Sequence, residues 1–166
     1  MALELVSGDV LEVQTDAVLL TIDGQKPGME GNIARQFARR FPEDWQYLQR
    51  DIRYPVPIGR TVIVPWDGDC PWSHILFAST LHQLGVLEEH EKLRVIRLAL
   101  TEALQLCVRH GISSLSTAVL QGGWRLSPEA ALREMELTYR SAGCLQVRLV
   151  IVVPNVGDSE QVVPNK

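Results

Sequence analysis

Short apolar runs separated by polar, glycine or proline residues recur along the chain, and each predicts a β-strand. The run Ala17–Ile22 is almost continuously apolar, which is typical of a central strand covered on both faces. Shorter runs predict the remaining strands at Leu3–Val6, Thr61–Pro65, His74–Thr80, Leu115–Leu120 and Gln146–Val153.

Between these strands, apolar residues recur at the three- and four-residue spacing of amphipathic helices. Ile33, Phe37 and Phe41 predict a helix that opens at Glu30-Gly31-Asn32 and is stopped by Pro42. A short helix over Glu43–Arg50 follows. The basic residues of the first helix fall on its other side, as a solvated face or as a cluster that steers an anionic ligand: Arg35, Arg39 and Arg40.

Two further helices are predicted in the second half of the chain. A long amphipathic one is ended by His110-Gly111, and the segment His82–His90 before it is interpreted as a variable loop. The apolar positions of this helix are Leu93, Ile96, Leu100, Leu104 and Cys107-Val108. The last helix has Ser127 as its N-cap and Pro128 at its first position, and it ends near Gly143.

Strands and helices alternate, and apolar strands need cover on both faces. The predicted fold class is therefore α/β, a three-layer α/β/α sandwich with a mixed central sheet, and a ligand is expected at the carboxyl ends of the strands. A length of 166 residues fits one domain, predicted over 1–156 and followed by a flexible C-terminal tail over 157–166.

Composition narrows the function classes. A net charge of −4 argues against a broad basic surface for nucleic acid, and no apolar run approaches the length of a membrane span. The chain opens without the pattern of a signal peptide.

Three scattered cysteines, Cys70, Cys107 and Cys144, favour reduced thiols in a cytoplasmic protein. Cys107 and Cys144, the latter opening the last strand, are predicted to be core. Cys70 lies in a polar loop without ligand spacing, so no metal site is expected.

Candidate binding chemistry lies between the strand Leu115–Leu120 and the helix that begins at Pro128. A Gly-Gly loop there places backbone N–H groups beside a helix N-terminus, which is a favourable position for an anion such as a diphosphate. The alternative interpretation is an ordinary strand-to-helix turn.

Four segments, in order and spacing, resemble the macro domain family of ADP-ribose-binding modules over Leu3–Pro154. Ser7-Gly8-Asp9-Val10 followed by Thr15–Val18 is similar to the family's opening motif, and Gly28–Ile33 is similar to the start of its first major helix. The other two segments are Ile58–Ile63 with His74–Phe77, and Ser114–Ala131.

The resemblance implies a ligand, ADP-ribose, and a set of contacts. Asp9 would accept a hydrogen bond from the adenine amino group, beside Val10, unless it only caps a turn. Two loops would approach the diphosphate, Gly28–Gly31 and Gln121-Gly122-Gly123, the second helped by Arg125. Trp124 would lie beside the distal ribose, or else serve in packing.

The chain also departs from the family pattern. Where the family has Asn-Ala-Ala-Asn, this chain has Leu20-Thr21-Ile22-Asp23, and the acidic residue of the glycine segment is Glu30. An ionised Asp only accepts hydrogen bonds, whereas Asn also donates. A module that binds ADP-ribose or an ADP-ribosylated protein or nucleic acid, without cofactor, metal or membrane, is therefore the first hypothesis.

Two alternatives remain open. The second hypothesis is a hydrolase of ADP-ribosyl linkages, or of O-acetyl-ADP-ribose, in which Asp23 and Glu30 hold a ribose hydroxyl and activate a water. The third is a degenerate scaffold that binds another nucleotide or a protein partner. Its interaction surface would comprise Trp66, Trp72, Trp124, Arg60 and Arg125.

Overall fold

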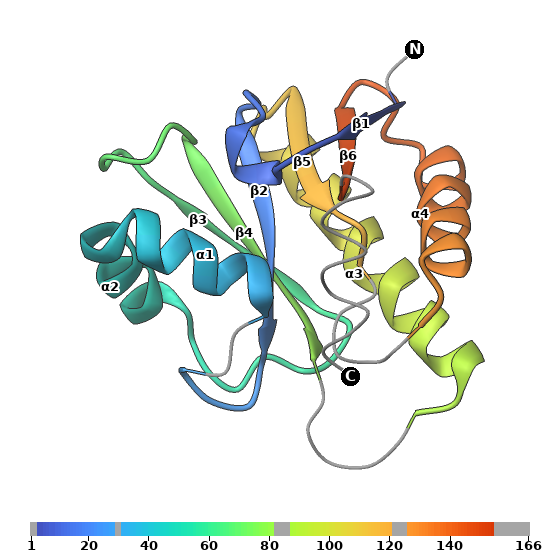
Figure 1. Cartoon of the computed structure of the whole chain (residues 1–166), viewed down its shortest axis with the longest axis horizontal. Coiled ribbons are helices and arrows are strands. Elements are labelled where there is room, and N and C mark those ends of the chain that lie inside the picture. The colour runs from blue at the N-terminus through green and yellow to red at the C-terminus, as the bar shows by residue number, and fades with distance from the viewer. Residues whose placement is uncertain (1–2, 29–30, 82–86, 121–125, 155–166) are drawn as a thin grey trace.

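The computed structural model describes residues 3–28, 31–81, 87–120 and 126–154 (Figure 1). Strands and helices alternate along these residues as the apolar pattern predicted. In chain order they are β1 (Leu3–Ser7), the 3₁₀-helix η1 (Val10–Glu12), β2 (Ala17–Asp23), α1 (Asn32–Arg40), α2 (Pro42–Asp51), β3 (Thr61–Pro65), β4 (His74–Leu81), α3 (Glu89–Arg109), β5 (Ser114–Ala118), α4 (Pro128–Ser141) and β6 (Arg148–Val153).

The strands form one six-stranded sheet in the order β1-β6-β5-β2-β4-β3. β3 pairs antiparallel with β4, and the other neighbouring strands are parallel, so the sheet is mixed. The carboxyl ends of the parallel strands β1, β6, β5, β2 and β4 therefore lie at one edge, which we call the carboxyl edge.

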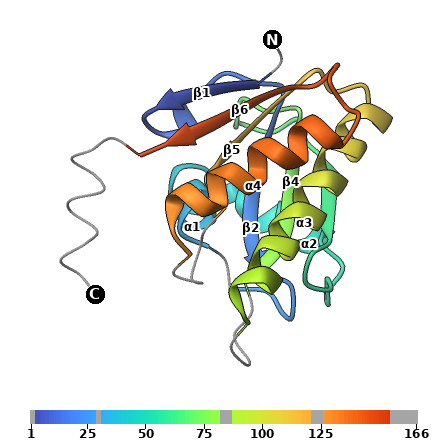
Figure 2. The same ribbon diagram turned by 90° about the vertical axis from the view of Figure 1, so that its right-hand side faces the viewer.

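Helices cover both faces of the sheet. On one face, alternate side chains of β2 such as Val18 and Leu20 pack with Phe37 of α1 and Leu48 of α2. On the other face, Leu19 packs with residues of α3 and α4. Figure 2 shows the sheet between these two helical layers. The predicted three-layer α/β/α sandwich is confirmed.

Local sequence signals fix the helix starts. The Ser127 hydroxyl oxygen accepts the N–H of Ala130 at 3.0 Å and Pro128 opens α4, as predicted. Pro42 ends α1 and also opens α2, because a proline at the first helical position sacrifices no intrahelical hydrogen bond.

Several boundaries differ from the predictions by one residue, and three differ by two. β5 ends at Ala118 rather than Leu120, and β6 begins at Arg148 rather than Gln146. Cys144 therefore precedes the strand, in a turn closed by the Val147 N–H to Cys144 carbonyl hydrogen bond of 3.0 Å. α3 begins at Glu89, inside the predicted loop 82–90, because Glu88 and Glu91 form a capping box.

Cys70 and Trp72 are more deeply buried than the sequence predicted. Cys107 and Cys144 lie in the core as predicted, but Cys70 is also buried. The Asp44 carboxylate holds the loop that contains Cys70 against the domain, because it accepts the N–H of Cys70 at 2.7 Å. Burial raises the pKa of Cys70 to about 11, so its thiol is a poor nucleophile near neutral pH. Trp72 is only 2% exposed, so it is not part of an interaction surface.

Two kinds of feature are absent from the described part of the chain. No helix there has the length and apolar character needed to cross a membrane. The same residues contain no group of three or more His, Cys, Asp or Glu side chains arranged to hold a metal ion.

Candidate functional site

The carboxyl edge brings two of the predicted site residues into one row. Asp9 follows the end of β1, and Asp23 is the last residue of β2. β6 and β5 separate these strands, so three interstrand spacings, about 14 Å in total, lie between them. An elongated ligand is therefore needed to contact both carboxylates.

Asp9 is held in a turn and remains half-exposed. One oxygen, Oδ1, accepts the N–H of Leu11 at 2.9 Å and caps η1, so the turn-capping interpretation is correct. The other oxygen pairs with the guanidinium of Arg40, which also contacts Glu12 Oε1 at 3.0 Å. The Asp9 side chain keeps 34% of its surface exposed, and an ionised carboxylate can accept further donors.

Val10 and the arginines of α1 differ in what they offer a ligand. The Val10 side chain is 2% exposed and packs in the core, so only its backbone is placed to reach a ligand. Arg35, Arg39 and Arg40 are all exposed, and Arg40 is in addition paired with two carboxylates. The predicted solvated face of α1 therefore includes one arginine committed to the Asp9 turn.

Asp23 has a contrasting environment at the end of β2. Its side chain is 1% exposed, and Oδ1 accepts the N–H of Gln25 at 3.0 Å. Oδ2 has no hydrogen-bond partner among the described residues. The register with β4 shifts between Ile22 and Asp23, an irregularity of the kind that re-aims side chains near functional sites.

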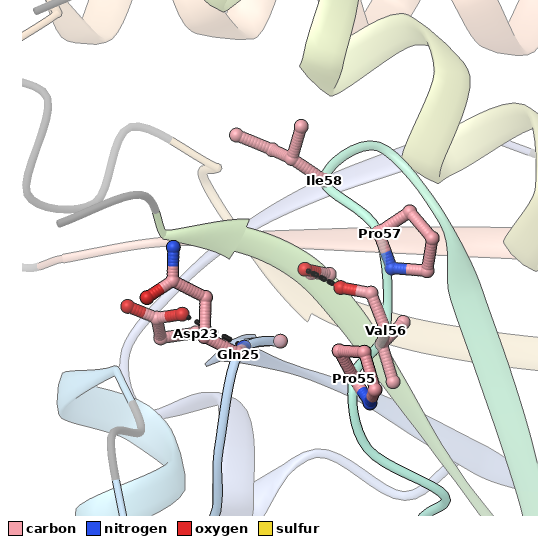
Figure 3. Close-up of a pocket in the computed structure, with 8 residues that line it drawn as sticks. Asp23, Gln25, Pro55, Val56, Pro57 and Ile58 are labelled. Atoms are coloured by element: carbon pink, nitrogen blue, oxygen red, sulfur yellow. Dashed lines mark hydrogen bonds between the residues drawn. The ribbon is translucent and has the colours of Figure 1, made fainter. Parts of the chain in front are cut away.

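A cavity of about 200 Å³ opens beside this carboxylate (Figure 3). Asp23 and Gln25 line one side, and Gly24 and Ser79 also line the cavity. The opposite wall is the apolar segment 55–58, which consists of Pro55, Val56, Pro57 and Ile58.

Hydrogen bonds fix the 55–58 wall to the two neighbouring strand ends. The Val56 N–H donates to the Gly24 carbonyl at 2.6 Å, and the Ser79 hydroxyl donates to the Val56 carbonyl at 2.9 Å. Gly59 N–H donates to the Ser79 carbonyl at 2.7 Å. The cavity is thus bounded by connected backbone rather than by a free loop.

The two described glycines of the first predicted phosphate loop have different roles. Gly31 donates its N–H to the Thr21 carbonyl at 2.9 Å, and a Cβ at this position would lie 2.2 Å from Thr21 Oγ1. Gly31 is therefore needed for close packing of the loop on β2. Gly28 has a φ of +88° and open space on its Cβ side, so it supplies backbone freedom.

Six predicted site residues lie outside the described part of the chain: Glu30, Gln121, Gly122, Gly123, Trp124 and Arg125. The residues that bracket the second loop are described. Leu120 follows β5, Leu126 precedes α4, and both side chains are 4% exposed. The chain therefore lies in the core at Leu120, after the end of β5, and again at Leu126, before the N-terminus of α4.

Sequence reasoning missed the cavity. The sequence pattern assigns no role to residues 54–57, and it places Ser79 only in the predicted strand His74–Thr80. The one available signal was Gly24, directly after the acidic end of a buried strand, because a glycine there permits another backbone to approach closely.

Together these features define an α/β domain with a candidate ligand site at the carboxyl ends of a mostly parallel sheet. Solved structures specify the fold further. The macrodomain of Mycobacterium tuberculosis DarG is 24% identical over 92% of this chain and 98% of that chain, with a TM-score of 0.72. The Oceanobacillus iheyensis macrodomain with ADP is 18% identical over 99% and 88% of the two chains, with a TM-score of 0.75.

A third structure, a mutant of the Oceanobacillus iheyensis macrodomain with ADPR, is 16% identical over 99% of this chain and 94% of that chain, with a TM-score of 0.64. No protein-family model matches the sequence, and no curated protein matches it. At these identities the likeness concerns the fold. The chain has the macrodomain fold, as the resemblance of its motifs predicted.

Proposed function

We propose that this domain binds ADP-ribose, either free or attached to a protein or nucleic acid. The observation that carries the proposal is the order of groups along the carboxyl edge: Asp9 after β1, the end of β5 with α4 following it in the chain, and Asp23 after β2. This order suits adenine, diphosphate and distal ribose in turn. The solved macrodomains with ADP and with ADPR support it.

Each part of the ligand meets suitable chemistry in this arrangement. The half-exposed Asp9 carboxylate accepts from the adenine amino group, and the backbone of Val10 lies beside it. The positive end of the α4 helix dipole favours the diphosphate, although Pro128 has no N–H and the N–H groups of Ala130 and Ala131 already bond to Ser127. We assign the remaining diphosphate contacts to Gly28, Gly31 and the loop residues 121–125. Because Arg40 already pairs with Asp9, adenine binding competes with this ion pair.

Calorimetric titration of ADP-ribose into the protein tests the proposal. Asp9→Asn should weaken binding roughly 10- to 100-fold, because a hydrogen bond to a charged acceptor contributes about 1.5–3 kcal/mol. Glu12→Gln is the matched control, because it also neutralises a carboxylate paired with Arg40 but is not the residue assigned to the adenine contact. Absence of binding to the wild type, or equal losses in both variants, contradicts the proposal.

Hydrolysis of an ADP-ribosyl linkage is a second candidate function, favoured by the unpartnered Oδ2 of buried Asp23. A carboxylate oxygen without a donor is free to hold a ribose hydroxyl while Glu30 takes a proton from water. The water oxygen bonds to the ribosyl carbon, the bond to the carrier breaks, and the carrier leaves with a proton. Release of ADP-ribose from an ADP-ribosylated protein should stop in the Asp23→Ala, Glu30→Ala double variant. Unchanged release would remove this mechanism.

A further inference from the structure

We infer that the cavity beside Asp23 binds the guanidinium group of an arginine side chain, so that the ADP-ribosyl group recognised by this domain is one carried on arginine. The second half of this inference rests on the proposed function. The first half concerns the cavity alone.

The buried carboxylate requires a partner that the described residues do not supply. Asp23 is 1% exposed and its Oδ2 has no hydrogen-bond partner there. Among the described side chains, no basic nitrogen forms an ion pair with it. An isolated buried charge is costly, and a hydrogen-bonding cation offsets part of that cost. A cationic donor therefore gains more at this position than a neutral hydroxyl.

The rest of the cavity fits the stem of an arginine side chain. Pro55, Val56 and Pro57 form an apolar wall opposite the carboxylate (Figure 3). Arginine combines an apolar three-carbon stem with a planar head that presents five N–H donors. The side chain of Gln25, which lines the same cavity, adds a further carbonyl acceptor for these donors.

The position of the cavity along the sheet agrees with this assignment. In the order β1-β6-β5-β2-β4-β3, Asp9 is at the β1 end, whereas the cavity lies on the far side of Asp23, between the ends of β2 and β4 and the segment before β3. A ligand that runs from Asp9 toward Asp23 would have its distal ribose next to the cavity. The group attached to that ribose would enter it.

Three small probes test the cavity without ADP-ribose. Butylguanidinium, butylammonium and the neutral butylurea are titrated separately into the protein, and the backbone amide signals of Gly24, Gln25 and Ser79 are followed by NMR. We expect saturable shifts with butylguanidinium and affinity about tenfold higher than for butylurea, as expected for a charge-assisted pair. Equal binding of butylurea or butylammonium, or no shift at all, overturns the inference.

Matched variants localise the effect. Asp23→Asn keeps the size of the side chain and should abolish the butylguanidinium shifts. Asp67→Asn removes an exposed carboxylate from the loop that joins β3 to the start of β4, at the opposite edge of the sheet, and should change nothing. Loss of the shifts in both variants would mean that only overall charge matters, and would overturn the site.

A peptide with ADP-ribosylarginine then tests the carrier. It should bind about tenfold more tightly than free ADP-ribose, the gain of one charged hydrogen bond. Free ADP-ribose that binds while butylguanidinium does not, or a peptide without gain, overturns this inference and leaves the proposed function intact. Butylguanidinium that binds while ADP-ribose does not contradicts the proposed function and leaves the cavity assignment intact.

Discussion

The two ends of β2 carry aspartates in opposite situations. Asp16 precedes the strand, is exposed, and its Oδ2 accepts both the N–H and the hydroxyl of Ser113, at 3.1 and 2.7 Å. The Ser113 hydroxyl, opposed by a smaller effect of burial, holds the pKa of Asp16 below its ordinary value. Asp23 ends the strand, is buried, and has one oxygen without a partner among the described residues.

The difference separates a structural carboxylate from a candidate ligand-binding one. Asp16 ties β2 to the start of β5, and its own N–H is bonded to the Ser114 hydroxyl at 2.8 Å. Its charge is compensated by the fold itself. Asp23 is the reverse case, because buried polar atoms are normally paired and an exception requires an explanation. A hydrogen-bond donor on a ligand would explain the unpaired oxygen of Asp23. Three substitutions, one of them with a control variant, test this difference between the two aspartates.

The largest effect on stability is expected for Gly24→Ala, at the residue that follows Asp23 and lines the same cavity. A Cβ at Gly24 would lie 1.9 Å from the Val56 carbonyl oxygen and 2.3 Å from Ser79 Oγ. The backbone of the 55–58 wall must then move, and we expect a loss of roughly 3 kcal/mol in the free energy of unfolding, as in an overpacked core. Urea denaturation measures it.

Gly28→Ala is the control within the same loop. Its Cβ would meet no atom within 4 Å, but its φ of +88° makes a side chain strained. The expected loss is about 1 kcal/mol, from backbone conformation alone. If both variants lost the same stability, close contact with Val56 would not be what makes Gly24 necessary.

Asp23→Asn should stabilise the protein without ligand. It removes a buried charge that lacks a partner, and the Asn oxygen can still accept the Gln25 N–H. The expected gain is about 1–2 kcal/mol, the scale of the penalty for an unsatisfied buried polar group. Thermal unfolding should show a higher Tm, and ligand binding should be impaired in the same variant. A lower Tm would show that the carboxylate is already compensated in the folded protein.

The sequence predicts the ends of β2 better than it predicts what surrounds them. A continuous apolar run between Asp16 and Asp23 is enough to place both at strand ends, and a polar residue after a buried strand is enough to suggest a site. The contacts that surround the candidate site cannot be predicted in this way. Arg40 reaches Asp9 across 31 positions, and the cavity depends on a backbone bond between Gly24 and Val56. Neither leaves a periodic signal, because both arise only when the layers pack.

The smallest effect is expected for Asp16→Asn, and its sign should be opposite to that of Asp23→Asn. The variant keeps one acceptor for Ser113 but replaces charge-assisted hydrogen bonds by neutral ones. Because Asp16 is exposed and screened by solvent, the loss should be at most about 1 kcal/mol. Urea denaturation at pH 7, with the Asp23→Asn protein measured alongside, gives the comparison.

The dependence of this loss on pH follows from the direction of the pKa shift. Asp16 has a lower pKa when folded than its ordinary value of 3.8, so its stabilisation is fully present above that value and is lost as pH falls through the folded pKa. The Asp16→Asn deficit in stability should therefore be constant from pH 7 to 5 and disappear in stronger acid.

Both Asn variants remove one negative charge and take the net charge from −4 to −3, so relief of general repulsion is common to them. If the two variants change the free energy of unfolding in opposite directions, the cause is the local surroundings of each carboxylate. If both variants gain the same stability, net charge alone accounts for the gain at Asp23.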